Sequence, residues 1–508
     1  MNSTSEVFHN RQQVTWSTLS SNMKILVEEM ARAAKIPVAL PNIDGKRSFF
    51  HAIQERHCNL EGSYNGDFWE PAINHLKSFE DWEFMLINNP PGYKEYLKSI
   101  GYDDDNARKQ ARVYENAHDI AQIILQHSDS FEWEKTCALQ QMVCDMWNTF
   151  VESTEFCTTS HCLPPIAKWA VDEMGPWSLS QHCVKKEDRI SLRGINHPVP
   201  IVSFPLHYSS KGILSWPVLA HEIAHTILET NSKAKIILSD AIKEGLEFDL
   251  SLYPKEIKDF WVEYWGSRLS EIGADVMAVL YMGPAAALSL IAYLKAHRGQ
   301  VLSNEIILKD PHPADTLRGL LVAHAVSFLN ISDPAKATWV NYLLHEVQKD
   351  FDKLDWELAN ICARRVAYIV MHTPIIDGKS LKDIKCWDNE DESLISYYLD
   401  GRNVQDELIH YRAPHIIASA NLYLLMDVQL QDSNDVRIDR IFKQMINNLY
   451  EGCSAPLEEK NSYSITKVKK PKKKNKINPV EATAIGVGGL ALVGIGILGF
   501  LAWRESRK

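Results

Sequence analysis

The stretch "VLAHEIAHTILE", from Val218 to Glu229, contains two histidines four residues apart, and a glutamate directly follows the first. Residues four apart lie on the same face of an α-helix, so His221 and His225 should project in the same direction. Two imidazoles on one face can bind one metal ion, and Glu222 is then close enough to reach a water molecule at that ion. Because such a triad also arises by chance, its meaning depends on the rest of the chain.

The surroundings of this triad favour a buried helix. Ser215 and Pro217 are plausible start signals, and Asn231 followed by Ser232 is a plausible end. Between these positions the segment is apolar almost all round, which is typical of a helix inside a core. Unpaired polar groups in a core cost a few kcal/mol each. A metal ion would satisfy both histidines and the glutamate at once.

A third ligand is expected in "RLSEIGADVMAVLYMG", which predicts a second buried helix from about Trp265 to Met282 that ends at Gly283-Pro284. Glu271 and Asp275 are again four apart and share one face. We expect Glu271 to bind the metal, while Asp275 accepts a hydrogen bond from the second nitrogen of a ligand imidazole and so orients the ring. The alternative is that both carboxylates only cap helices or form salt bridges.

The segment "KDPHPADTLRGLLVAHA", Lys309 to Ala325, places His312 between two prolines, just before a predicted helix that carries Arg318. A histidine in so stiff a loop can donate a hydrogen bond to the oxyanion of a tetrahedral intermediate, with Arg318 bonding carboxylates or backbone nearby. An ordinary helix-capping loop explains the same residues equally well.

The three segments together resemble a known family. The order "HEIAH … EIGAD … HP-x4-R" is similar to that of the gluzincin metallopeptidases, and within them to the CAAX prenyl endopeptidases and heat-shock membrane proteases. The resemblance covers roughly Ser210 to Ala325 and departs from that group in lacking apolar membrane helices around the motifs. It implies one Zn²⁺ ion with His221, His225 and Glu271 as its ligands. Glu222 then corresponds to the general base and Asp275 to the carboxylate that supports a ligand. His312 and Arg318 correspond to the last motif of that family.

The function that the resemblance implies is a zinc metalloendopeptidase, which hydrolyses a protein or peptide substrate by a zinc-activated water with Glu222 as general base. The extended segment His197–Ser210 is expected to be an edge strand or strand pair whose free edge receives the peptide. Tyr208 or His207 would help to hold the oxyanion, and both candidates stay open. Two alternatives remain: a membrane-tethered scaffold or effector with a structural or inactive zinc site, and another kind of zinc hydrolase.

The expected fold is mainly α, with a zincin-like core of short strands and buried active-site helices, flanked by helical regions and followed by a C-terminal transmembrane helix. The predicted organisation is an N-terminal helical region 1–185, a catalytic domain 186–330, a C-terminal helical region 331–450, a polar and Lys-rich linker 451–480, a transmembrane helix 481–503 and a basic tail 504–508. A hypothesis is that the helical regions cover the cleft until a regulatory partner or substrate arrives.

Charge and cysteine usage limit the class of protein. From Lys467 to the end, 10 Lys and Arg stand against 2 Glu, a net of +8. Since the whole chain carries −11, residues 1–466 carry −19, which argues against a nucleic-acid partner. The nine cysteines are scattered and form no C-x-x-C pair, as in reduced cytosolic proteins.

The C-terminal segment predicts a membrane anchor. Residues 482–503 contain no charge and would span about 33 Å as a helix, which matches a bilayer core of about 30 Å. Seven lysines between Lys467 and Lys476 precede it and should stay in the cytosol, where they attract anionic lipid. The six glycines of the segment offer small faces for self-association. We therefore expect a single-pass C-terminal anchor with the catalytic body in the cytoplasm.

Overall fold

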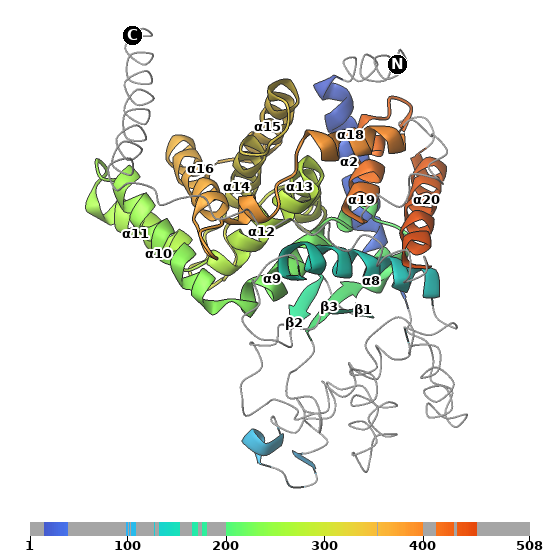
Figure 1. Ribbon diagram of the computed structural model, residues 1–508, viewed down its shortest axis with the longest axis horizontal. Coiled ribbons are helices and arrows are strands. Elements are labelled where there is room, and N and C mark those ends of the chain that lie inside the picture. The colour runs from blue at the N-terminus through green and yellow to red at the C-terminus, as the bar shows by residue number, and fades with distance from the viewer. Residues whose placement is uncertain are drawn as a thin grey trace, which may run out of the picture. The chain divides into compact units, whose positions relative to one another are not determined.

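The computed structural model describes residues 15–38, 98–99, 101, 103–107, 126, 132–152, 165–170, 175–179, 200–352, 354–399, 413–430 and 434–454. Within these residues the protein is mainly helical, as the sequence predicts, and residues 1–454 form one compact unit (Figure 1). None of the described helices is both long and apolar enough to cross a membrane. The predicted linker, transmembrane helix and basic tail lie outside the described residues, apart from the first four residues of the linker.

The helices that lie before or after the candidate site are α2 (Trp16–Ala33), α8 (Trp133–Trp147), α15 (Asp333–Gln348), α16 (Trp356–His372), α17 (Leu381–Ile384), α18 (Asn389–Leu399), α19 (Ala413–Met426) and α20 (Asn434–Ser454). A π-helical turn, Asn148–Glu152, extends α8, and short 3-10 turns at Leu206–Ser209 and Ile213–Ser215 follow the last strand. Most of these helices contribute apolar side chains to a core cluster shared with the central helices. The predicted N- and C-terminal helical regions therefore pack in the same core as the predicted catalytic region.

Six helices form the part of the chain that carries the sequence motifs: α9 (Val218–Thr230), α10 (Ser232–Asp249), α11 (Lys255–Gly266), α12 (Leu269–Met282), α13 (Pro284–His297) and α14 (Asp315–Ser327). Helix α12 is buried along its length and packs against α9, α13 and α14. The predicted limits of the first motif helix are confirmed: α9 ends at Thr230, and the Asn231 side chain caps α10 by accepting a hydrogen bond from the Ala234 amide.

The second motif helix is shorter than predicted. The predicted start at Trp265 is wrong, because Trp265 belongs to α11. The residues Ser267 and Arg268 are not helical and separate α11 from α12. The predicted end is confirmed at Gly283, whose φ of +61° lies in the left-handed region that favours glycine. A Cβ atom at Gly283 would lie only 2.6 Å from the Trp387 ring, so this turn also needs the absence of a side chain.

The described strands form one small sheet in the order β1-β3-β2: β1 is Ile166–Ala170, β2 is Trp177–Leu179 and β3 is Ile201–Pro205. Strand β3 pairs in parallel with β1 and antiparallel with β2. The prediction of an edge strand in this segment is therefore wrong, because β3 is the central strand. Its prolines do not prevent this, since Pro200 and Pro205 stand at its two ends and leave the amides between them free to pair.

The sheet lies next to the first motif helix. Helix α9 contacts both β2 and β3, and α8 packs on β1 (Figure 1). Two of the three strands come from before residue 185, so the sheet joins the predicted N-terminal region to the predicted catalytic region. Among the described strands, the edge strand beside α9 is β2 and not β3, which the sequence analysis expected there.

Candidate metal centre

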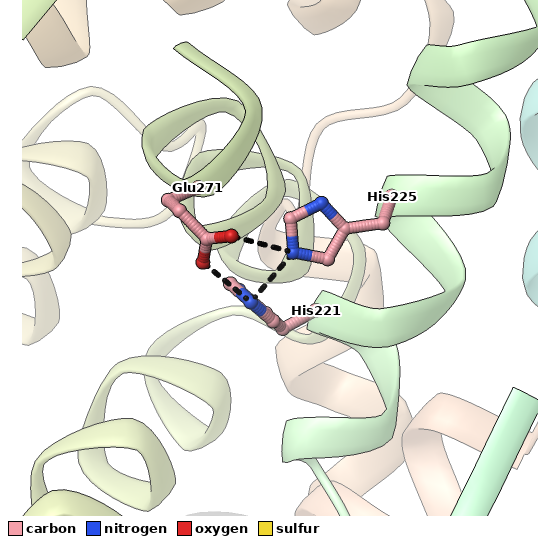
Figure 2. A group of neighbouring side chains, drawn as sticks. All are labelled: His221, His225 and Glu271. Carbon is pink, nitrogen blue, oxygen red and sulfur yellow. Dashed lines mark hydrogen bonds and ion pairs between the residues drawn. The ribbon is translucent and has the colours of Figure 1, made fainter. Parts of the chain in front are cut away.

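The metal-ligand candidates meet between α9 and α12. His221 and His225 project from successive turns of α9, and Glu271 reaches them from the first turn of α12 (Figure 2). The two Nε2 atoms of the histidines are 3.0 Å apart. Glu271 Oε2 lies 3.3 Å from His221 Nε2, and Glu271 Oε1 lies 3.5 Å from His225 Nε2. The structure therefore brings the three predicted ligands together around one point.

Two of these three distances fit a tetrahedral metal ion, and the 3.0 Å between the two histidine nitrogens is slightly shorter than such a site gives. Zinc binds imidazole nitrogen and carboxylate oxygen at about 2.0–2.2 Å, so adjacent ligand atoms of a tetrahedral site lie about 3.3–3.6 Å apart. The Glu271 Oε2 atom is buried and has no hydrogen-bond partner, although nitrogen atoms of His221 and His312 lie 3.3 and 3.4 Å away. A cation between these groups would satisfy this oxygen. The residues present thus fit a zinc ion held by two imidazoles and a carboxylate.

Asp275 contacts His221 at its Nδ1 atom, and Arg318 in turn bonds Asp275. Asp275 Oδ1 lies 2.8 Å from His221 Nδ1, which is the interaction that the sequence predicts for it. Arg318 donates two hydrogen bonds to the same carboxylate, from Nε at 2.8 Å and from Nη2 at 2.7 Å. Both residues are buried. The predicted carboxylate partner of Arg318 is therefore Asp275, and the pair fixes the His221 ring so that its Nε2 faces His225 and Glu271.

The electrostatics follow from burial and these close charges. Burial alone would lower the pKa of His221, but the adjacent Asp275 carboxylate raises it to about 10. Burial would raise the pKa of Glu271, but the adjacent His221 and His225 rings lower it well below its usual range. Glu271 and Asp275 are thus anionic at neutral pH. A metal cation at the site would compete with the proton that His221 otherwise carries.

Glu222 lies beside the ligands on α9 and is buried. Burial is the largest influence on its carboxyl group and raises its pKa, whereas His221 and His225 act in the opposite direction. Among the described residues none donates a hydrogen bond to this carboxylate. Glu222 is therefore a buried carboxyl group within electrostatic reach of both histidines, with a raised affinity for a proton.

His312 approaches the group from the exposed side. Its Nε2 lies 3.4 Å from Glu271 Oε2, and its Nδ1 lies 2.7 Å from Asp310 Oδ1. About half of the His312 side chain is exposed, so the ring stands at the boundary between solvent and the metal-ligand candidates. Arg268 bonds the backbone carbonyls of Ile307 and Leu308 and so holds the loop that carries this histidine. This arrangement suits a residue that meets a ligand arriving from solvent.

Three further residues belong to this site and were not predicted from the sequence. Asp310 orients His312, Ser270 lies 3.1 Å from His225 Nδ1, and Arg268 anchors the His312 loop. A signal for two of them was present, because Asp310 stands two residues before His312 and Ser270 directly precedes Glu271. Nothing local marks Arg268, whose partners lie about 40 residues further along the chain.

The two candidates for oxyanion stabilisation, Tyr208 and His207, are buried in the 3-10 turn after β3. The Tyr208 hydroxyl is 2.8 Å from His297 Nε2 and is therefore engaged with the end of α13. Burial, followed by the effect of His297, lowers the pKa of His207 to about 4, so its ring is neutral at pH 7. The described contacts link these two residues to His297 and not to the metal-ligand candidates.

Comparisons with models of known protein families, with curated proteins and with solved structures found no match.

Proposed function

We propose that this chain is a zinc-dependent metallopeptidase that hydrolyses peptide bonds in a protein or peptide substrate. The observation that carries the proposal is the group His221, His225 and Glu271, with the buried carboxyl of Glu222 next to the first ligand. Three protein ligands, with a carboxyl group at hand to move protons, are typical of catalytic zinc, whereas structural zinc is usually closed by four ligands, often cysteines. The resemblance of the motif order to gluzincins supports the same function.

When bound, a zinc ion supplies a Lewis acid that polarises a carbonyl group and makes a water molecule more acidic. Glu222 accepts the proton of the attacking water and delivers it to the leaving amine. Its raised pKa suits both steps, because general acid–base catalysis is most efficient when the pKa lies near the working pH. Asp310 holds the Nδ1 side of His312, which leaves Nε2 to donate a hydrogen bond to substrate oxygen. Arg318 acts through Asp275, which positions His221.

Removal of the metal tests the proposal directly. We expect purified full-length protein in detergent to contain about one zinc per chain and to cleave casein. Chelation followed by dialysis should abolish cleavage, because the carboxyl and imidazole groups alone do not activate water strongly. Re-addition of one equivalent of zinc should restore it. Metal content by mass spectrometry and casein fragments by gel are the measurements. Zinc binding without any cleavage would instead favour a scaffold or effector with a structural ion.

The membrane anchor is a separate part of the proposal and rests on residues 482–503. Deletion of residues 482–508 should move the protein from the membrane pellet to the soluble fraction, because the deletion removes the uncharged segment. Zinc content and casein cleavage should be retained, since residues 1–454 form a compact unit of their own. Protease added to intact cells should leave the body undigested. Digestion from outside would overturn the cytoplasmic placement, and a truncated chain that stays in the pellet would overturn the anchor.

A further inference from the structure

Two pairs of large apolar side chains are exposed on α11 and on the loop that precedes α14. Ile257 and Phe260 are 39% and 38% exposed, and a spacing of three residues places them on one face of α11. Ile307 and Leu308 are 48% and 69% exposed. Single exposed apolar residues are common on protein surfaces, whereas a contiguous group of them marks a binding surface. The two pairs form such a surface only if they adjoin.

Contacts of Tyr264 and Arg268 bring the two pairs together. The rings of Phe260 and Tyr264 are stacked with their centroids 5.7 Å apart, and the Arg268 guanidinium lies 4.0 Å from the centre of the Tyr264 ring. Nη2 of Arg268 donates hydrogen bonds to the backbone carbonyls of Ile307 and Leu308. The loop therefore runs along the face of α11 that carries Phe260, and the two exposed pairs adjoin. We call this surface of four residues the apolar strip: Ile257, Phe260, Ile307 and Leu308.

The apolar strip ends at the exposed side of the candidate metal centre. Nε of Arg268 lies 3.4 Å from the carbonyl oxygen of His312, which stands four residues after Leu308. The His312 side chain is about half exposed, and its Nε2 lies 3.4 Å from Glu271 Oε2. Arg268 itself stands three residues before Glu271, at the start of α12. A polypeptide that reaches the site past His312 therefore continues onto the apolar strip.

The charges around the apolar strip disfavour an anionic lipid surface as its partner. Helix α11 and residues 305–312 together carry three lysines and five acidic side chains, a net of 3 − 5 = −2. Anionic membrane surfaces attract clusters of basic residues instead. Two lysines beside the strip are also engaged, because Lys255 pairs with Asp259 and Lys243 pairs with Glu263. An apolar segment of a protein suits this surface better than lipid headgroups do.

We propose that the apolar strip binds an unfolded, apolar stretch of the protein substrate, a few residues away from the bond that is cut. The inference rests on the proposed peptidase function and adds a substrate class to it, namely proteins that expose apolar side chains in an extended segment. Contact with the strip removes apolar surface of both partners from water, and the gain in binding grows with the area removed. A substrate too short to reach the strip gains nothing from it.

The kinetic test compares a long and a short substrate of the full-length protein. Casein is the long one, and the short one is a peptide of about four residues around a casein bond that the wild type cuts, which reaches about 7 Å to either side of that bond. In Ile307→Ser/Leu308→Ser and in Ile257→Ser we expect KM for casein to rise at least about tenfold and kcat to change less than about threefold. For the short peptide KM should change less than about twofold. Val436→Ser is the matched control, because it removes an exposed apolar side chain on α20, and it should behave as wild type.

A binding measurement separates the apolar strip from the chemistry. In the Glu222→Gln background, either change to the strip should weaken binding of fluorescein-labelled casein at least about tenfold, as measured by fluorescence anisotropy. Zinc content and melting temperature should stay at the wild-type level, since the substituted side chains are exposed.

The outcomes distinguish this inference from the proposed function. A wild type that cleaves casein while both strip variants keep KM within about threefold would overturn this inference alone. Equal losses for casein and the short peptide would also overturn it, as would a loss of activity in lipid vesicles without one in detergent. A change from dimer to monomer with unchanged KM would assign the strip to a second copy of the chain and overturn it too. A wild type that loads zinc, binds casein through the strip and cleaves nothing would overturn the proposed function and support the strip as a binding surface.

Discussion

Replacement of Glu222 by glutamine should abolish peptide hydrolysis while zinc content and fold are retained. The amide is nearly isosteric with the carboxylate but cannot accept a proton from the attacking water, so we expect cleavage to fall by about two to four orders of magnitude. The position is buried and within electrostatic reach of His221 and His225, yet it is not one of the three grouped ligands. The measurements are casein cleavage and metal analysis of the purified variant.

Glu229→Gln is the matched control for this change. Glu229 lies two turns further along the same helix and bonds Lys235, so its substitution tests the chemical change away from the metal-ligand candidates. We expect the control to cleave at the wild-type rate. If Glu222→Gln retains activity within tenfold of wild type, Glu222 is not the general base and the proposed mechanism is wrong. If it loses zinc as well as activity, the residue acts in assembling the site.

The candidate site was predictable from the sequence to the extent that it depends on helix geometry. Spacing of four residues places His221 beside His225 and Glu271 beside Asp275, and the α-helix repeat fixes both pairs. We inferred that the two pairs face each other from the cost of burying unpaired charge. In the structure, the distances between atoms of the two pairs are 2.8–3.5 Å. Arg268 could not be found in this way, because its partners Ile307 and Leu308 lie about 40 residues further along the chain.

The fold was predictable in its helices and not in its sheet. Helical periodicity gives the limits of α9 within a residue or two, because local caps and breakers end it. The position of β3 depends instead on which strands pair with it, and those strands lie 20 to 40 residues earlier in the chain. The sequence of a five-residue strand does not show which strands pair with it. A strand flanked by prolines is therefore predicted to be an edge strand even when it is the central one.

Replacement of Glu271 by alanine should remove the metal. It deletes one of the three candidate ligands and leaves His221 and His225 without the carboxylate that would offset the charge of a metal ion. We expect zinc affinity to fall by more than about 100-fold, beyond the 10- to 100-fold that loss of a supporting residue causes. Equilibrium dialysis with zinc is the measurement. The control is Glu263→Ala on α11, an exposed carboxylate whose loss should change nothing.

Asp275→Ala should weaken zinc binding by only about 10- to 100-fold, because Asp275 orients His221 and is not a ligand. It should also lower the free energy of unfolding by about 3–5 kcal/mol, since the buried Arg318 guanidinium then lacks its partner. Asp275→Ala combined with Arg318→Met removes both charges and should recover most of that stability without recovering zinc affinity. Recovery of both would mean that the carboxylate acts on the metal only through the fold. Stoichiometric zinc and full activity in Glu271→Ala would place the third ligand elsewhere and remove the basis for the gluzincin-like assignment.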